Sequence, residues 1–401
     1  MGVTGRPVRI LYLADRLSVR GGADLHLLDV IRWAAERGHR VTVACGRREA
    51  GAVPPPGVEV VTVRGLAAAV ASGARLGGLD ALLDRAELVH VQNVMNPVAL
   101  RAAAATGRAV VTVQDHRLFC PGPGRTLPGG APCRELPADG TCAACLADAA
   151  YRERMLALTA ARLKAVRGAR LVVLSRYMAR ELAAAGHPGA AVVPPVVEAV
   201  PERRRDAGRA FLLGGRLVRH KAPLDGVRAW ELAGRPLPLR VAGEGPLAAA
   251  LGGVEHLGWL DREALRRELG RARALLFPAR WQEPFGILGV EALGVGTPVI
   301  VADSGGTEEW SGAGCLRVAA GDVAAMAEAV RRLAADPGLA LELGEAGRRL
   351  VAERFAPAAV WPRLEAVYRE VLSGSPGRGS SPASQAPGTT ASVPDGSPGR
   401  A

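Results

Sequence analysis

Hydrophobic and polar positions in the first half of the chain alternate between short apolar runs and segments of helical periodicity. Residues 8–14 form a β-branched and aliphatic run, which predicts a buried strand. In the next segment, 23–37, apolar side chains recur every three or four residues, which predicts a helix that ends before Gly38. Further strands are predicted at 40–45, 58–63, 88–91, 109–113, 171–174 and 191–193.

A Pro- and Arg-rich stretch, 201–208, interrupts this alternation and predicts an exposed linker. The same alternation then starts again. Strands are predicted at 211–213, 239–242, 254–257, 274–277 and 298–302, and closing helices at 320–334, 337–355 and 357–372. Strands that alternate with helices predict parallel sheets covered by helices on both faces.

The expected architecture is therefore α/β, with two doubly wound Rossmann-like domains that face an interdomain cleft. The expected units are an amino-terminal domain at 1–200 with a Cys-rich insertion at 117–148, a carboxy-terminal domain at 201–355, a closing helix at 356–372 that could cross back, and a Ser/Pro/Gly-rich disordered tail at 373–401. Ligands of doubly wound sheets bind at the carboxyl ends of the strands, so the cleft is the expected site.

Composition narrows the class of protein. Of the 401 residues, 49% are hydrophobic and 22% charged, which excludes a mostly disordered or collagen-like chain. No apolar run approaches the roughly 18 residues of a membrane-spanning helix. The first 22 residues lack the apolar region and cleavage site of a signal peptide, so we expect a cytoplasmic protein.

The formal net charge is +12, and nearly all of the basic residues are arginines. The codon usage of a GC-rich genome is the favoured explanation of this excess. The functional alternative is attraction to a polyanion, which would be nucleic acid, anionic lipid or a phosphorylated substrate. Aromatic residues make up only 4% of the chain, which leaves few platforms for base stacking. We therefore do not expect nucleic acid to be a partner.

The strongest chemical motif spans 281–302. An apolar strand leads into a loop with Glu283, and a helix is predicted to start near Gly286 and to carry Glu291. The free N–H groups at a helix N-terminus favour a phosphate or a sugar hydroxyl, and two carboxylates can accept hydrogen bonds from two hydroxyl-bearing parts of one ligand. The alternative is that Glu283 only complements the helix dipole and Glu291 is a solvated helix residue.

Two further motifs contain glycines and cations. Arg216 and Lys221 follow the first strand of the second domain, where two cations suit a pyrophosphate. Lys221 is informative because it is one of only two lysines in the chain, although a solvated lysine is the simpler explanation. Gly21 and Gly22 follow the first strand of the chain and allow the backbone to approach a ligand closely.

These three motifs, in this order, resemble the retaining family-4 glycosyltransferases of the GT-B fold, also described as glycosyl transferases group 1. The resemblance covers about 8–372. It implies a glycosyltransferase, of the hexosyltransferase type, that moves a sugar from a nucleoside diphosphate sugar to a saccharide, lipid-linked or small-molecule acceptor with retention of anomeric configuration. Cell-envelope polysaccharide synthesis, with peripheral contact at the inner face of the membrane, is one setting that fits such an enzyme.

The resemblance also implies roles for individual residues. Arg216 and Lys221 would hold the donor diphosphate, Glu291 the ribose hydroxyls and Glu283 the transferred sugar. The backbone amides of Phe285, Gly286 and Ile287 would line the sugar and phosphate, and Gly21 and Gly22 would close over the donor from the other domain. Fixed cations would stabilise the leaving diphosphate, so no catalytic metal is expected.

One position departs from the family pattern. The family has a His-Asp pair near the reacting sugar, whereas here Gln114 precedes Asp115 and His116 comes two residues late. Gln114 cannot act as a base. Either Gln114 only hydrogen-bonds the sugar, or His116 takes the role of the family histidine, or catalysis is impaired.

The insertion contains four of the six cysteines. Cys120, Cys133, Cys142 and Cys145 end in a C-x2-C spacing that is typical of zinc ligands. A structural zinc ion is the leading hypothesis, with disulfides, free thiols or another metal as alternatives. The insertion follows the strand that carries Gln114, so it is expected to border the acceptor site.

Other functions remain as alternatives. A nucleotide-sugar epimerase or hydrolase of the same fold would act on the donor without an acceptor. A basic zinc-loop protein that binds nucleic acid would show a steep dependence on salt and no sensitivity to substitution of Glu291.

Overall fold

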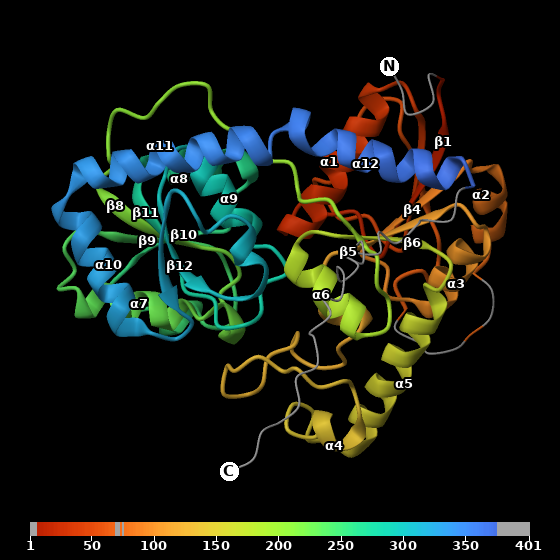
Figure 1. Ribbon diagram of the computed structural model, residues 1–401, viewed down its shortest axis with the longest axis horizontal. Helices are drawn as coiled ribbons and strands as arrows, with labels where there is room; N and C mark the ends of the chain where they lie inside the picture. The colour runs from red at the N-terminus through yellow and green to blue at the C-terminus, as the bar shows by residue number, and fades with distance from the viewer. Residues whose placement is uncertain (1–5, 69–72, 74–75, 375–401) are drawn as a thin grey trace, which may run out of the picture.

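The computed structural model describes residues 6–68, 73 and 76–374, and forms two α/β domains (Figure 1). The predicted tail falls almost wholly on residues 375–401, outside the described residues. The prediction of two parallel-sheet α/β domains is confirmed.

The amino-terminal domain contains a parallel seven-stranded sheet in the order β3-β2-β1-β4-β5-β6-β7. Its strands are β1 Arg9–Ala14, β2 Arg40–Cys45, β3 Glu59–Thr62, β4 Leu88–Gln92, β5 Ala109–Val113, β6 Arg170–Val173 and β7 Ala191–Val192. Its helices are α1 Gly22–Glu36, α2 Leu79–Arg85, α3 Pro97–Ala105, η1 His116–Leu118, α4 Asp139–Cys142, α5 Ala149–Ala165 and α6 Arg176–Ala184. The central strands β4 and β5 are buried along their whole length, as expected for a sheet covered on both faces.

The carboxy-terminal domain contains a parallel six-stranded sheet in the order β10-β9-β8-β11-β12-β13. Its strands are β8 Ala210–Gly214, β9 Leu239–Ala242, β10 Glu255–Gly258, β11 Ala272–Phe277, β12 Val299–Asp303 and β13 Cys315–Ala319. Its helices are η2 Arg219–Lys221, α7 Pro223–Leu232, η3 Ala248–Ala250, α8 Arg262–Arg271, α9 Ile287–Gly294, η4 Gly305–Glu309, α10 Val323–Ala335 and α11 Pro337–Arg354. The sequence pattern does not predict β13, because this edge strand is only partly buried and carries a charged Arg317.

The last helix, α12 (Pro357–Leu372), leaves the carboxy-terminal domain and packs on the amino-terminal one. Figure 1 shows it in blue beside α1, beyond the end of α11. Trp361 of α12 stacks on Trp33 of α1 with ring centroids 5.1 Å apart. The two domains are therefore joined twice, by the chain before β8 and by α12.

The strand order fixes where a ligand can bind in each sheet. In both sheets the order of connection reverses in the middle, between β1 and β4 and between β8 and β11. Loops at such a switch point diverge and leave a crevice at the carboxyl ends of the strands. The glycine pair follows β1, Lys221 follows β8 and Glu283 follows β11, so three of the sequence motifs lie at switch points.

Candidate active site

The loop between β11 and α9, residues 278–286, carries the strongest sequence motif. We call it the donor loop, after the role that the family resemblance implies for it. Glycines hold this loop and the start of α9 against the indole of Trp310. Gly286, directly before α9, has a φ of 88°, which non-glycine residues rarely adopt. A Cβ atom at Gly289 would lie 2.1 Å from Cη2 of Trp310, so only glycine lets α9 pack directly on this ring. Trp310 Nε1 donates a hydrogen bond of 2.6 Å to the carbonyl oxygen of Phe285. The start of α9, with backbone N–H groups that lack intrahelical partners, is therefore fixed in place.

Lys221 and Glu283 form an ion pair at this loop. The Lys221 ammonium contacts Glu283 Oε1 and lies 4.9 Å from the centre of the Trp281 ring. The Glu283 side chain is only 3% exposed, whereas that of Lys221 is 25% exposed. A carboxylate buried to this degree needs a cationic partner. The structure thus brings together two residues that are 62 positions apart in the sequence.

Arg216 approaches the same region from the turn after β8. It is exposed, and its charge reaches the imidazole of His220. Burial, with Lys221 and then Arg216 adding to the effect, lowers the pKa of His220 to about 4. Arg216 and Lys221 therefore both lie near enough to His220, beside the donor loop, to favour its neutral form.

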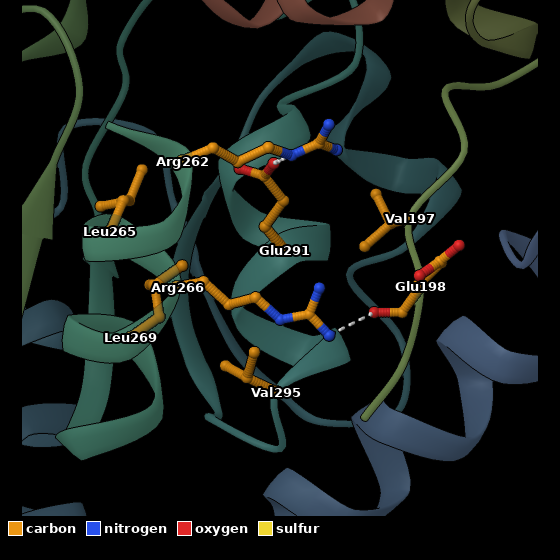
Figure 2. Close-up of a pocket in the computed structure, with 8 residues that line it drawn as sticks. All are labelled: Val197, Glu198, Arg262, Leu265, Arg266, Leu269, Glu291 and Val295. Atoms are coloured by element: carbon orange, nitrogen blue, oxygen red, sulfur yellow. Dashed lines mark hydrogen bonds and ion pairs between the residues drawn. The ribbon is translucent and has the colours of Figure 1, made fainter. Parts of the chain in front are cut away.

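Glu291 lies further along α9, in a separate pocket (Figure 2). Its Oε1 is 3.5 Å from Nε of Arg262, and Val197 and Val295 contribute apolar walls. Burial raises the pKa of the Glu291 carboxyl, and Arg262 opposes this effect. The described side chains of Lys221 and Glu283 do not line this pocket.

The glycines after β1 meet α9 from the other domain. Gly21 is the residue before α1, and Gly22 is the first residue of that helix. A Cβ atom at Gly22 would lie 3.2 Å from Cδ1 of Ile287, the first residue of α9. The structure therefore places the glycine pair opposite the amide groups that the resemblance implies for donor binding.

Gln114 lies at the end of β5 and points toward the start of α1. Its side chain is buried, and Nε2 donates a hydrogen bond of 3.4 Å to the carbonyl oxygen of Ala23. Its Oε1 has no hydrogen-bond partner among the described residues. Gln114 therefore holds its amide close to the glycine pair, with His26 as a polar neighbour.

His116 points elsewhere, into the wall between the insertion and the donor loop. Its Nε2 lies 3.0 Å from the Tyr177 hydroxyl, and its ring packs at 5.7 Å from the Trp281 ring. Burial lowers the pKa of His116 to about 4, so the imidazole is neutral at pH 7. Within the described structure Nδ1 has no partner, and Gly124 packs against it.

The structure does not support the predicted zinc site at the cysteines of the insertion. In the described residues, no group of three or more His, Cys, Asp or Glu side chains is placed to hold a metal ion. Instead, the sulfur atoms contact the backbone of their own loop. Cys120 Sγ accepts a hydrogen bond of 3.4 Å from the Arg125 amide, and Cys145 Sγ lies 3.8 Å from the Thr126 carbonyl oxygen. All six cysteines are free thiols in the structure, Cys133 and Cys142 included, so the zinc hypothesis is not supported.

The insertion nevertheless contacts the donor loop. The Gln282 amide donates a hydrogen bond of 3.0 Å to Thr126 Oγ1, and Gly124 packs against Trp281. The sequence places the insertion after β5 but gives no signal for this contact, which only the fold creates.

Comparison with known proteins decides the family. The model of the family "Glycosyltransferase Family 4" matches residues 20–199, and that of "Glycosyl transferases group 1" matches residues 200–350. The chain belongs to glycosyltransferase family 4. The recognition made from the motifs is therefore confirmed, and neither a nucleic-acid-binding protein nor an epimerase or hydrolase is favoured.

Curated relatives match part of the chain. A glycogen synthase of Mycobacterium tuberculosis is 32% identical over 182 residues, which cover 41% of this chain and 44% of that protein. An alpha-maltose-1-phosphate synthase of Mycolicibacterium smegmatis is 32% identical over 191 residues, which cover 44% of this chain and 48% of that protein. The chain thus matches less than half the length of these family members.

Solved structures match almost the whole fold. HepE from Anabaena in complex with UDP superposes with a TM-score of 0.64 at 16% identity, and covers 89% of this chain and 98% of its own. Sucrose-phosphate synthase from Thermosynechococcus elongatus gives a TM-score of 0.65 at 18% identity, and covers 92% of this chain and 100% of its own. These similarities confirm the GT-B fold.

Some polar residues at the domain boundary are not predicted from the sequence. Asp29 of α1 and Arg262 of α8 form a close ion pair across the domains, and His26 of α1 lies near Gln114. Burial lowers the pKa of His26 to about 4, against the opposing charge of Asp29. In the sequence these are ordinary polar positions on amphipathic helices, so no signal marks them.

The described residues contain no helix that is both long and apolar enough to cross a membrane.

Proposed function

We propose that this protein transfers a hexosyl group from a nucleoside diphosphate sugar to a saccharide acceptor with retention of anomeric configuration. The observation that carries the proposal is the Lys221–Glu283 ion pair beside the start of α9, at the switch point between β8 and β11. Neighbouring folds were solved with UDP and with UDP-glucose, and the names of relatives describe saccharide synthesis, which supports this donor and acceptor class.

In this reaction the bond between the anomeric carbon and the diphosphate oxygen breaks, and negative charge develops on the leaving diphosphate. The acceptor hydroxyl oxygen bonds to the same carbon, and its proton passes to the leaving diphosphate. Lys221, Arg216, the first N–H group of α9, at Ile287, and the N–H groups of Phe285 and Gly286 just before that helix would stabilise that charge. Glu283 would hold hydroxyl groups of the transferred sugar and also fix the position of the Lys221 ammonium. Fixed cations and backbone dipoles of this kind need no reorganisation during the reaction.

We assign different roles to Gln114 and His116, because their side chains point in different directions. Gln114 holds its buried amide next to the glycine pair, so we assign it a hydrogen bond to a hydroxyl group of the sugar. His116 packs against Trp281, so we assign it the support of the donor loop. Gln114→Ala should therefore lower kcat more than His116→Phe does, as turnover assays of the two variants would show.

The first experiment identifies the donor. A thermal-shift screen of nucleoside diphosphates and nucleotide sugars should show one base that stabilises the protein, since a ligand at 100 times its Kd contributes about 2.7 kcal/mol. Incubation of the selected nucleotide sugar with saccharide and lipid-linked acceptors, followed by NMR of the product, then reports the acceptor class and the anomeric configuration. A product of inverted configuration, or hydrolysis without transfer, would contradict the proposal.

Substitution of the two lysines gives a matched test. Lys221→Met should lower kcat by roughly 10²- to 10³-fold, which is the usual cost of losing one donor to a developing oxyanion. Lys164→Met is the control, because Lys164 is exposed on α5, away from the donor loop. Equal activity of both variants would remove Lys221 from the mechanism.

A further inference from the structure

Arg262 makes contacts in both domains at once. It is the first residue of α8, and its Nη1 lies 2.8 Å from both carboxylate oxygens of Asp29 on α1 of the amino-terminal domain. Its Nε lies 3.5 Å from Oε1 of Glu291 on α9 of its own domain. One guanidinium thus bridges a carboxylate on each side of the domain boundary, and Figure 2 shows its contact with Glu291.

The surroundings make Arg262 the main counterion of Glu291. Burial disfavours the charged form of this carboxyl, and of the two arginines that oppose burial, Arg262 has the larger effect and Arg266 the smaller. Arg266 also donates a hydrogen bond of 3.4 Å to the Glu198 carbonyl oxygen (Figure 2). A guanidinium has a planar set of five N–H donors, so Arg262 can satisfy Asp29 with one edge while Nε faces Glu291.

Asp29 is in turn held by its own domain. Arg32, one helical turn further on, contacts Asp29 Oδ1 at 3.3 Å, and His26 lies on the same face of α1. The Asp29 side chain is only 15% exposed, so it is a largely desolvated anchor for Arg262. A shift of α1 away from α8 would break the contact and leave Arg262 without its closest partner.

We propose that Arg262 is a positioning residue that holds the Glu291 carboxylate ready for the ribose of the donor and couples ribose binding to the contact between the two domains through Asp29. This inference rests on the proposed function and on the role that the family resemblance implies for Glu291, which is to bind the ribose hydroxyls of the donor. Because Arg262 acts through Glu291, its contribution depends on the presence of those hydroxyls in the ligand. A residue that only stabilised the fold would affect every nucleotide equally.

The test compares two ligands in wild type and variants of the full chain. The probes are UDP and 2′,3′-dideoxy-UDP, or the corresponding pair for the base that the thermal-shift screen selects, with Kd measured by calorimetry. Arg262→Met should weaken UDP binding roughly tenfold, equivalent to about 1.4 kcal/mol, and leave the Kd of the dideoxy analogue within about twofold. The conservative Arg262→Lys should restore part of the loss. In turnover assays Arg262→Met should raise KM for the donor more than it lowers kcat.

Three further variants separate the possible failures. Arg267→Met is the matched control, because Arg267 is exposed on the same helix and should leave both Kd values unchanged. Asp29→Asn should weaken UDP binding less than Arg262→Met does and increase the radius of gyration of the free protein in small-angle scattering. If Glu291→Gln does not remove the preference for UDP over the dideoxy analogue, the ribose role in the proposed function is wrong and this inference falls with it. If Glu291→Gln removes the preference but Arg262→Met weakens both ligands equally, only the role of Arg262 is overturned.

Discussion

In the proposed function, the Lys221–Glu283 ion pair contributes to both stability and chemistry. A carboxylate that is 3% exposed would be costly without a cation, and a partly exposed lysine supplies that cation while keeping one side open to a ligand. The same lysine lies over the Trp281 ring, which restricts the ammonium further. Each residue is therefore placed by the other, and neither acts independently.

A double-mutant cycle tests this dependence. Lys221→Met and Glu283→Gln should each destabilise the protein, and the double variant should be more stable than the sum of the two effects predicts, by about 0.5–3 kcal/mol. The reason is that the second substitution removes a group that the first has already left unpaired. Urea unfolding followed by tryptophan fluorescence measures the three free energies. Strict additivity would show that the pair contributes no coupling.

At the scale of elements, α12 is the helix whose removal would change most. It carries Trp361 and Tyr368 into the hydrophobic core of the domain that the chain left more than 150 residues earlier. The Tyr368 hydroxyl lies 3.0 Å from that of Tyr12 on β1 and 2.6 Å from His90 Nδ1 on β4, and His90 Nε2 contacts Thr112 at 2.7 Å. This buried polar chain links α12 to the middle of the sheet.

The buried hydrogen-bonded groups around Tyr368 predict a measurable loss of stability when its hydroxyl is removed. Tyr368→Phe keeps the ring but removes a hydroxyl that satisfies two buried groups, so the free energy of unfolding should fall by about 1–3 kcal/mol. Tyr151→Phe is a suitable control, because Tyr151 is exposed on α5. Thermal and urea unfolding compare the two variants with wild type. An equal, negligible effect of both substitutions would mean that water replaces the Tyr368 hydroxyl at no cost.

For the whole molecule, burial of histidines makes stability depend on pH. Burial lowers the pKa of His26, His116 and His220 to about 4 and that of His90 to about 3. The unfolded chain takes up protons near pH 6.5, whereas the folded chain takes them up only near pH 4. Between these values the unfolded state binds more protons, so stability is full above about pH 6.5 and is lost as the pH falls. Asp15, whose pKa burial raises to about 6, and Glu291, whose pKa burial also raises, have the opposite effect. The histidines outnumber these two carboxyls, since burial also lowers the pKa of His39 and His187.

The melting temperature should therefore fall as the pH is lowered from 7 to 5, as differential scanning calorimetry can measure. His116→Phe should make this dependence shallower, because phenylalanine fills the same aromatic surroundings without taking up a proton in the unfolded state. An unchanged slope in His116→Phe would show that His116 titrates alike in the folded and unfolded chain.

The contact between the domains also belongs to the scale of the whole molecule. Ser175 Oγ donates a hydrogen bond of 2.7 Å to the Pro284 carbonyl oxygen, and Glu309 contacts Arg176 from the other side of the boundary. Together with the Asp29–Arg262 pair, these contacts hold α6 and α1 against the donor-loop side of the second domain. They join Pro284, the residue after Glu283, and Glu309 of η4 to elements of the other domain.

The sequence by itself determined the two α/β domains and the donor motif. Short segments of the chain are enough to show the alternation of strand and helix periodicity. They also show turns that require glycine, such as the one at Gly286. Local chemistry of this kind also identified Lys221, Glu283 and the glycine pair as one set of candidates. The family comparison confirmed the fold and the enzyme class that this set implied.

Only the tertiary structure decided which distant side chains meet. Asp29 and Arg262 are 233 positions apart, so no local pattern relates them. The spacing of Cys142 and Cys145 resembles that of zinc ligands. The fold brings Cys120 and Cys133 near them, and burial together with these neighbours raises the pKa of both thiols. Ligation requires a closer arrangement that spacing alone cannot specify, and the described residues hold no such group. For the same reason the sequence could not distinguish the direction of Gln114 from that of His116, since burial against Trp281 arises only when the second domain packs on the first.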